Sequence, residues 1–159
     1  VKVPEGKDLA YITQTTLSVA ETRKIIEALK SRFPNIIGPD AGDLCYATGN
    51  RQSAVLELCA HVDMLLVVGA KNSSNSSRLM ELGLEQGIKS HLIDDVNDLD
   101  PAWFEGIDTV GLSSGASAPE VLVQGVVEWL KGKFPGLEVE NLVKLVENTK
   151  FNLPKALQD

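Results

Sequence analysis

The sequence predicts an α/β protein built from repeated strand-turn-helix units around parallel sheets. Three segments, 9–33, 64–87 and 109–134, share one order: an apolar strand-like run, a turn rich in small hydroxyl residues, and an amphipathic helix. Strands that alternate with helices of this length call for parallel pairing through right-handed crossovers. Because ligands of such sheets bind beyond the carboxyl ends of the strands, all three turns should lie at binding edges.

The first unit carries signals for both ends of its helix. Ser18 and Glu21 form an S-x-x-E capping box, and Pro34 is expected to stop the helix. Thr15 and Thr16 occupy the turn before it. Apolar residues at helical spacing between the two ends are Ile25, Ile26, Leu29 and Phe33.

The second unit begins with the apolar run "MLLVV" at 64–68. Leu79 and Leu82 give the helix its apolar spacing, and Gly87 is the expected end of the helix. Gly83 inside the helix weakens its intrinsic propensity, since glycine costs about 1 kcal/mol relative to alanine. The pattern nevertheless predicts a helix after the polar turn.

The third unit repeats the capping box, with Ser117 and Glu120 before a helix. The apolar residues of this helix are Val121, Leu122, Val126 and Leu130. Further strands are expected at 44–48 and 90–94, and a further helix at roughly 50–62.

Domain boundaries follow from where this pattern starts and stops. We expect residues 1–41 to be the C-terminal half of one α/β domain and residues 42–133 to be a second, last α/β domain. The hydroxyl turns stop after about residue 134, so 134–159 is expected to be a C-terminal extension. The chain starts with Val1 rather than methionine and enters a strand-like run at once, which suggests a piece of something longer.

Composition narrows the class of partner. The chain has 22 acidic and 15 basic residues and a net charge of -7, which disfavours a nucleic-acid surface but leaves a small anionic ligand open. No apolar run is long enough to span a membrane. Two cysteines, Cys45 and Cys59, form no disulfide framework and fit a reducing compartment, so we expect a cytoplasmic protein.

The turn of the second unit has more polar side chains than a helix cap needs. One N-cap requires one residue, whereas 72–77 supplies six in a row. A turn that opens a helix presents free N–H groups and the positive end of the helix dipole to an anion. Ser73, Ser74, Asn75 and Ser117 are therefore a candidate phosphate or diphosphate cradle, with Thr15 at the equivalent place in the first unit. Each turn taken alone is better explained as an ordinary helix cap.

Other reactive side chains give weaker signals. No G-x-x-x-x-G-K-[ST] or G-x-G-x-x-G motif is present, which disfavours the common nucleotide folds. Cys45, near the end of a predicted strand, fits either a reactive thiol or a buried core residue, whereas Cys59 lies at helical spacing among apolar residues and is expected in the core. Residues expected at the surface or in structural roles are His61, His91, Asp94, Asp95 and Asp98.

Five strings, in this order, resemble one enzyme family: "TQTTLSV", "CYAT-x-NRQ", "KNSSNS-x-RL", "LIDD" and "GASAPEVLVQ". They are similar to 4-hydroxy-3-methylbut-2-enyl diphosphate reductase, which makes isopentenyl and dimethylallyl diphosphates by reductive dehydroxylation in the methylerythritol phosphate route. The resemblance runs from about Leu9 to Pro154. It implies a trefoil of three α/β domains around a 4Fe-4S cluster, of which this chain would be the C-terminal portion.

The resemblance also implies roles for individual residues. Cys45 matches one of three cysteine ligands of the cluster, and Thr15 matches a threonine near the substrate hydroxyl. Ser73, Ser74, Asn75 and Ser117 match contacts to the diphosphate. The implied partners are an allylic diphosphate, an electron donor such as ferredoxin or flavodoxin, and the N-terminal part of the enzyme.

The remaining functional groups of the family, two cysteines, the substrate-binding histidines and a proton-donating glutamate, would lie upstream of this chain. We therefore expect this polypeptide alone to be inactive. One alternative is a diphosphate-binding module or degenerate paralogue without redox chemistry. Another is a fragment that folds but binds nothing.

Overall fold

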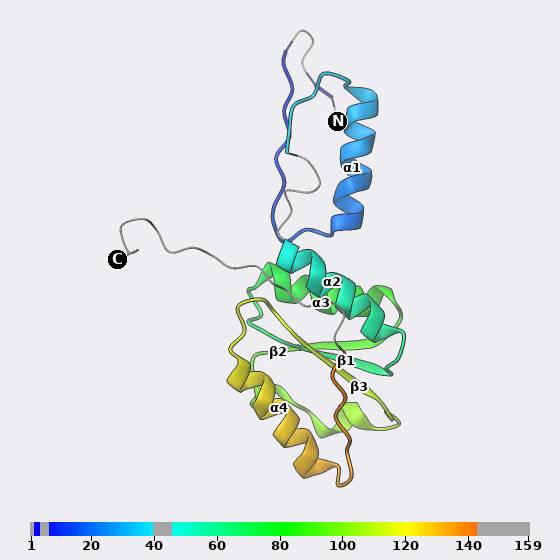
Figure 1. The fold of residues 1–159 in the computed structure, drawn as a ribbon, viewed down its shortest axis with the longest axis vertical. Coiled ribbons are helices and arrows are strands. Elements are labelled where there is room, and N and C mark those ends of the chain that lie inside the picture. The colour runs from blue at the N-terminus through cyan, green and yellow to red at the C-terminus, as the bar shows by residue number, and fades with distance from the viewer. Residues whose placement is uncertain (1, 4–6, 40–45, 143–159) are drawn as a thin grey trace, which may run out of the picture.

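The computed structural model describes residues 2–3, 7–39 and 46–142. Most of its described residues belong to an N-terminal segment, residues 7–39, and a sheet domain, residues 46–142 (Figure 1). The N-terminal segment holds α1 (Val19–Arg32) alongside two extended stretches. No helix in the described part of the chain combines the length and apolar character needed to cross a membrane.

The centre of the sheet domain is a three-stranded parallel sheet. Its strands are β1 (Met64–Val68), β2 (Lys89–Ile93) and β3 (Val110–Ser114), in the order β2-β1-β3. The register pairs Val68 with both Ile93 and Ser114, so the carboxyl ends of all three strands lie level. The α/β class with parallel pairing is thus confirmed, and the turns that follow β1 and β3 meet at one edge.

Helices cover both faces of this sheet (Figure 1). On one face, α2 (Tyr46–Cys59) and α3 (Ser74–Glu85) pack on Leu65 and Val67 of β1. On the other, α4 (Glu120–Lys133) packs on Met64, Leu66 and Val68. Successive strand side chains point to opposite faces, and all five of β1 are fully buried because both faces are covered.

The link between β2 and β3 is made of short helical turns. These are η2 (Val96–Asp98) and η3 (Pro101–Phe104), and Phe104 closes the core under α4. The predicted C-terminal extension falls largely outside the described residues. Its described start, 134–142, contains no helix or strand, although Leu137 packs on the α4 side of the core.

The strand predicted at 44–48 is wrong where the structure describes it, because α2 already begins at Tyr46. The buried residues of α2 lie at 48, 52, 55 and 59, which is helical spacing. Two of them, Thr48 and Gln52, are polar, so the helical period at the start of α2 is not visible in the spacing of apolar residues. Residues 44 and 45 of this prediction lie outside the described residues.

The capping box predicted at Ser117 and Glu120 is also wrong. The cap residue of α4 is Pro119, which makes no side-chain cap hydrogen bond, and the helix begins at Glu120. Proline disfavours helical backbone in the residue before it, so the helix cannot start at Ala118 as a Ser117 cap requires. The cap at Ser18 is confirmed, since its Oγ accepts from the N–H of Glu21 at 3.3 Å.

The strand-like run at the start of the first unit forms only an isolated bridge between Ala10 and Ile37. Two backbone hydrogen bonds flank it, Tyr11 N–H to Ile37 O at 2.9 Å and Ile37 N–H to Leu9 O at 3.0 Å. A β-strand requires several successive residue pairs with a neighbouring strand. The described N-terminal segment contains a single such pair, so this run is not a β-strand there.

Candidate functional site

The polar turn of the second unit forms the N-terminus of α3, directly beyond the carboxyl end of β1. Ser73 is the N-cap, and its Oγ accepts from the N–H of Ser76 at 3.3 Å. Its carbonyl accepts from the N–H of Ser77. The helix provides no acceptor for the N–H groups of Ser74 and Asn75, so these two donors and the helix dipole point toward the sheet edge.

Asn75 is the unusual residue of this turn. It is 8% exposed, yet neither its Nδ2 nor its Oδ1 has a hydrogen-bond partner within the described residues. Leaving a buried amide unsatisfied costs about 1–3 kcal/mol, so native proteins seldom do it without a reason. The side chain is thus preset to bond a group that the described residues do not provide.

Two glycines let α3 come this close to the sheet. A Cβ atom on Gly69, after β1, would collide with Ser76 Oγ and lie 2.9 Å from Ser76 Cβ. A Cβ on Gly115, after β3, would also collide with Ser76 Oγ and lie 3.7 Å from Asn75 Nδ2. Glycine at both strand ends therefore brings the turn of the third unit against the α3 N-terminus.

The turn of the third unit carries Ser117, which is exposed. The turn is held at its start by Arg51 of α2, whose Nη1 donates to the carbonyl of Ser114 at 3.0 Å and to its Oγ at 3.3 Å. Arg51 was not singled out as a site residue from the sequence. Its charge on a buried helix face next to Gln52 was the signal that could have found it.

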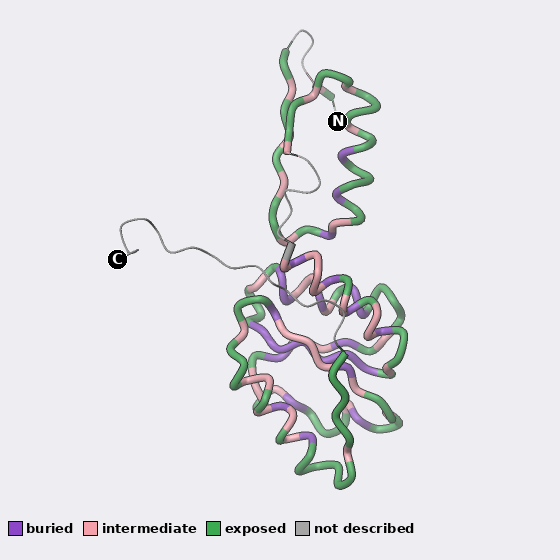
Figure 2. Tube along the Cα trace, in the orientation of Figure 1, coloured by how far each residue is buried: buried purple, intermediate pink, exposed green. Residues whose placement is uncertain are grey.

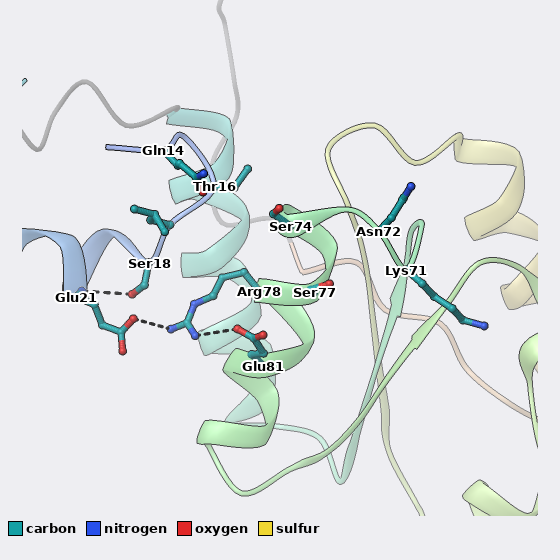
Figure 3. Close-up of a pocket in the computed structure, with 11 residues that line it drawn as sticks. Gln14, Thr16, Ser18, Glu21, Lys71, Asn72, Ser74, Ser77, Arg78 and Glu81 are labelled. Atoms are coloured by element: carbon teal, nitrogen blue, oxygen red, sulfur yellow. Dashed lines mark hydrogen bonds and ion pairs between the residues drawn. The ribbon is translucent and has the colours of Figure 1, made fainter. Parts of the chain in front are cut away.

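The turn of the first unit lies beside α3 as well. A cleft of about 430 Å³ is lined on one side by Thr16 and Leu17 and on the other by Ser74 and Ser77 (Figure 3). Thr15 is exposed on the same turn. The structure thus places the first turn next to the α3 N-terminus. The sequence pattern predicted this turn at the carboxyl end of a sheet strand, but the run before it forms an isolated bridge in the described residues.

One guanidinium crosses this cleft. Arg78 of α3 extends toward α1, with Nη2 3.6 Å from Glu21, and binds Glu81 on its own helix at 3.2 Å (Figure 3). It also binds Glu85 at 2.7 Å. Burial disfavours the charge, but the hydrogen bonds to Glu85 and Glu81 and the charge of Glu21 outweigh it, so the pKa of Arg78 is raised. Arg78 therefore stays a cation and is already neutralised by its own carboxylates.

A second cation steadies the turn before α3. The backbone N–H of Lys71 donates to Asp94 at 3.2 Å, and its Nζ binds Asp98 at 3.2 Å. The N–H of Asp94 and the Lys71 ammonium hold the pKa of Asp98 below its usual range. Asp94 and Asp98 thus help to hold the turn before α3.

Cysteine chemistry is confined to one described residue. Cys59 is buried among the α2, α3 and β1 side chains, as expected, and burial raises the pKa of its thiol. Cys45 lies outside the described residues and immediately precedes α2 in the sequence. Among the described residues, no three histidine, cysteine or acidic side chains are grouped so that they could hold a metal ion.

The histidine of β2 is structural. His91 stacks on Trp103 with ring centroids 3.8 Å apart. Burial and the neighbouring charge of Lys89 lower its pKa.

These features define an α/β protein whose polar turns and one unsatisfied amide gather at the carboxyl edge of a parallel sheet. Comparison with known proteins then identifies the family. The model of the LytB protein family matches residues 1–131, and the chain belongs to this family.

Its relatives are named as one enzyme. The 4-hydroxy-3-methylbut-2-enyl diphosphate reductase of Zymomonas mobilis is 53% identical over 156 residues, which are 98% of this chain and 46% of that protein. A reductase of the same name, numbered 1, from Rhodopseudomonas palustris is 54% identical over 98% of this chain and 50% of its own length. The chain therefore spans about half the length of the curated relatives it matches.

A solved structure gives the same picture of the fold. The structure of the E-1-hydroxy-2-methyl-but-2-enyl-4-diphosphate reductase from Plasmodium falciparum superposes with a TM-score of 0.86 at 35% identity. The superposition covers 98% of this chain and 49% of that protein. The arrangement of the N-terminal segment beside the sheet domain is thus similar to that of half of a known reductase.

Proposed function

We propose that this chain is the C-terminal, diphosphate-binding part of an oxidoreductase. The whole enzyme would convert 4-hydroxy-3-methylbut-2-enyl diphosphate to isopentenyl and dimethylallyl diphosphates by reductive dehydroxylation. Family membership and the names of the relatives support the reaction class. The observation that carries the binding role is the buried, unsatisfied amide of Asn75 at the N-terminus of α3.

A phosphate group would satisfy this turn. Its oxygens accept from the Asn75 amide and from the first N–H groups of α3, and the helix dipole favours the negative charge. Ser73 and Ser74 add small hydroxyl donors, and Ser117 contributes from the neighbouring turn. Because Arg78 is neutralised by three carboxylates, neutral donors rather than free cations would bind the anion.

The reacting end of the substrate is assigned to residues on the other side of the cleft. Thr15 is proposed to lie near the substrate hydroxyl, on the turn that faces the α3 N-terminus. Cys45 stays a proposed ligand of a 4Fe-4S cluster, and this assignment rests on its motif. The described residues contain no cluster site of their own. Such a cluster supplies single electrons, which a donor such as ferredoxin or flavodoxin would replace.

The second candidate is a diphosphate-binding module without redox chemistry. Like the first candidate, it is supported by the polar turn at the N-terminus of α3 and by the buried amide of Asn75. The two candidates share the diphosphate turn and differ in whether Cys45 binds iron together with an N-terminal partner. Two experiments therefore address them separately.

The binding turn is tested on the chain itself by calorimetric titration with inorganic diphosphate. We expect a dissociation constant of about 1 mM or tighter. Asn75→Ala should weaken binding by about tenfold or more, since a charge-assisted hydrogen bond is worth about 1.5–3 kcal/mol. The control is Asn97→Ala, an exposed asparagine on η2. Unchanged binding by Asn75→Ala would contradict the assignment.

The redox role is tested in a fusion protein in which this chain follows the N-terminal half of the Zymomonas mobilis relative. After anaerobic reconstitution, the fusion protein should reduce the allylic diphosphate, whereas the chain alone should not. Cys45→Ala should abolish iron binding, and Cys59→Ala should retain it because Cys59 is in the core. A reconstituted fusion protein that binds diphosphate but holds no iron would favour the binding module instead.

A further inference from the structure

The motif Asn50-Arg51-Gln52 has no role in the proposed binding turn, yet it joins the turns of the site. Consecutive helix residues point about 100° apart, so Arg51 and Gln52 can reach different elements from one turn of α2. Arg51 bonds Ser114 at the end of β3. Gln52 points toward the first unit.

Gln52 is 6% exposed, and both ends of its amide are used. Nε2 donates to the carbonyl of Leu17 at 3.0 Å, and Oε1 accepts from the N–H of Val19 at 3.3 Å. The side chain thus bonds the backbone on both sides of Ser18, the cap of α1, in the way that a neighbouring strand would. It fixes the peptide that begins two residues after Thr15.

Within the first turn, the N–H of Leu17 donates to the carbonyl of Gln14 at a long 3.5 Å. The extended stretches of the described N-terminal segment are joined by the Ala10–Ile37 bridge and by the Tyr11 hydroxyl, which donates to the carbonyl of Pro39 at 2.7 Å. Across to α3, Glu21 pairs with Arg78 at 3.6 Å, and this pair is screened by solvent because the Glu21 side chain is 64% exposed. The bonds of Gln52 are buried and neutral, and they define position more strictly than a half-exposed ion pair.

We propose that Gln52 is a positioning residue that holds the Thr15 turn against the α3 turn, while Arg51 holds the Ser114–Ser117 turn from the same helix. This inference rests on the proposed function, in which the first turn faces the reacting end of the substrate and α3 holds the diphosphate. A displaced first turn would then impair the chemical step more than substrate binding.

The variants are made in the fusion protein. Gln52→Ala removes both hydrogen bonds, and Gln52→Met removes them while keeping the side-chain length. The matched control is Gln124→Ala, an exposed glutamine on α4 that bonds only the Glu120 side chain at 2.8 Å. Thermal unfolding and iron content are measured for each variant, so that only folded, loaded protein is compared.

Both Gln52 variants should lower kcat by about tenfold or more, because small misplacements of substrate-positioning groups cost this much. KM should stay within about twofold, since the diphosphate turn is untouched. The amide of Val19, which loses its acceptor, should exchange its hydrogen faster in both Gln52 variants and not in Gln124→Ala.

Three outcomes would overturn the inference. A Gln52→Ala fusion with kcat and KM like the parent would overturn it while leaving the proposed function intact. A Gln52→Met protein with full kcat beside an impaired Gln52→Ala would show that side-chain volume, not hydrogen bonding, holds the turn. An inactive parent fusion would overturn the proposed function and this inference with it.

Discussion

The N-terminal segment and the sheet domain have the same strand-turn-helix pattern but very different cores. In residues 7–39, Ile26 is the one buried apolar side chain among those described, and Ile12, Ile25 and Ile37 are 93%, 60% and 69% exposed. In the sheet domain, all five side chains of β1 are fully buried (Figure 2). A unit buries its apolar face only when neighbouring strands and helices cover it.

The largest expected contrast is in core deletions. Leu66→Ala, at the centre of β1, should lower the free energy of unfolding by about 3 kcal/mol, because it leaves a cavity between fully buried neighbours. Ile26→Ala in α1 should change the same transition by less than about 1 kcal/mol, since the segment can open without the sheet domain. Urea unfolding followed by circular dichroism measures both. Equal losses would show that the two regions share one core.

The next contrast is in how closely the helices pack against the neighbouring turns and helices. Gly115→Ala should destabilise the chain by about 2 kcal/mol, because its Cβ collides with Ser76 Oγ. Adding Ser76→Ala should recover most of this loss, since the Ser76 Cβ lies 3.4 Å from the new Cβ. The same unfolding assay on both variants tests the contact, and an uncompensated loss would point to another cause.

The matched substitution at the junction of the two regions is Gly49→Ala in α2. Its new Cβ would meet Val19 Cγ2 at an ordinary 3.6 Å. Replacing a helix glycine by alanine then gains about 0.5–1 kcal/mol. A loss at Gly49 like that at Gly115 would contradict the looser packing of the N-terminal segment.

A smaller effect is expected from pH at the opposite edge of the sheet. Asp63 accepts from the side chain and N–H of Thr109 and from the N–H of Asp108, and these bonds lower its pKa below 3.8. A lowered folded-state pKa adds stability above the unfolded value, which is lost as the pH falls through the folded value. The parent should therefore lose stability below pH 3.8 more steeply than Asp63→Asn in acid titrations of unfolding. Parallel curves would contradict this.

The smallest effect is expected at the ion pair between the regions. Glu21→Gln removes the 3.6 Å contact with Arg78, which should cost about 0.2–1 kcal/mol because Glu21 is largely exposed. Raising the ionic strength from about 0.05 to about 0.5 M should abolish the difference between parent and variant. Hydrogen exchange of α1 measures it locally. A salt-independent loss would mean that Glu21 acts through something other than charge.

Structural features that depend only on residues close together in the chain could be predicted from the sequence. The apolar run of β1 and the cap at Ser18 follow from periods and capping chemistry that act over a few residues. Parallel pairing followed from the alternation of elements. The polar turn at 72–77 was also evident, because six such residues exceed what one cap needs.

Only the tertiary structure decided which polar residues become buried and what they bond. The first turn of α2 was predicted as a strand, although its Thr48 is buried as a helix residue. Gln52, inside the predicted helix, is also buried, and it bonds Leu17 and Val19, more than 30 residues away. Among the polar residues of the second turn, Asn75 is distinguished by a buried amide without a partner in the described residues, next to Gly115 of another unit. Local patterns determine elements, but the satisfaction of a buried polar group depends on long-range neighbours, and this is why the site required the fold.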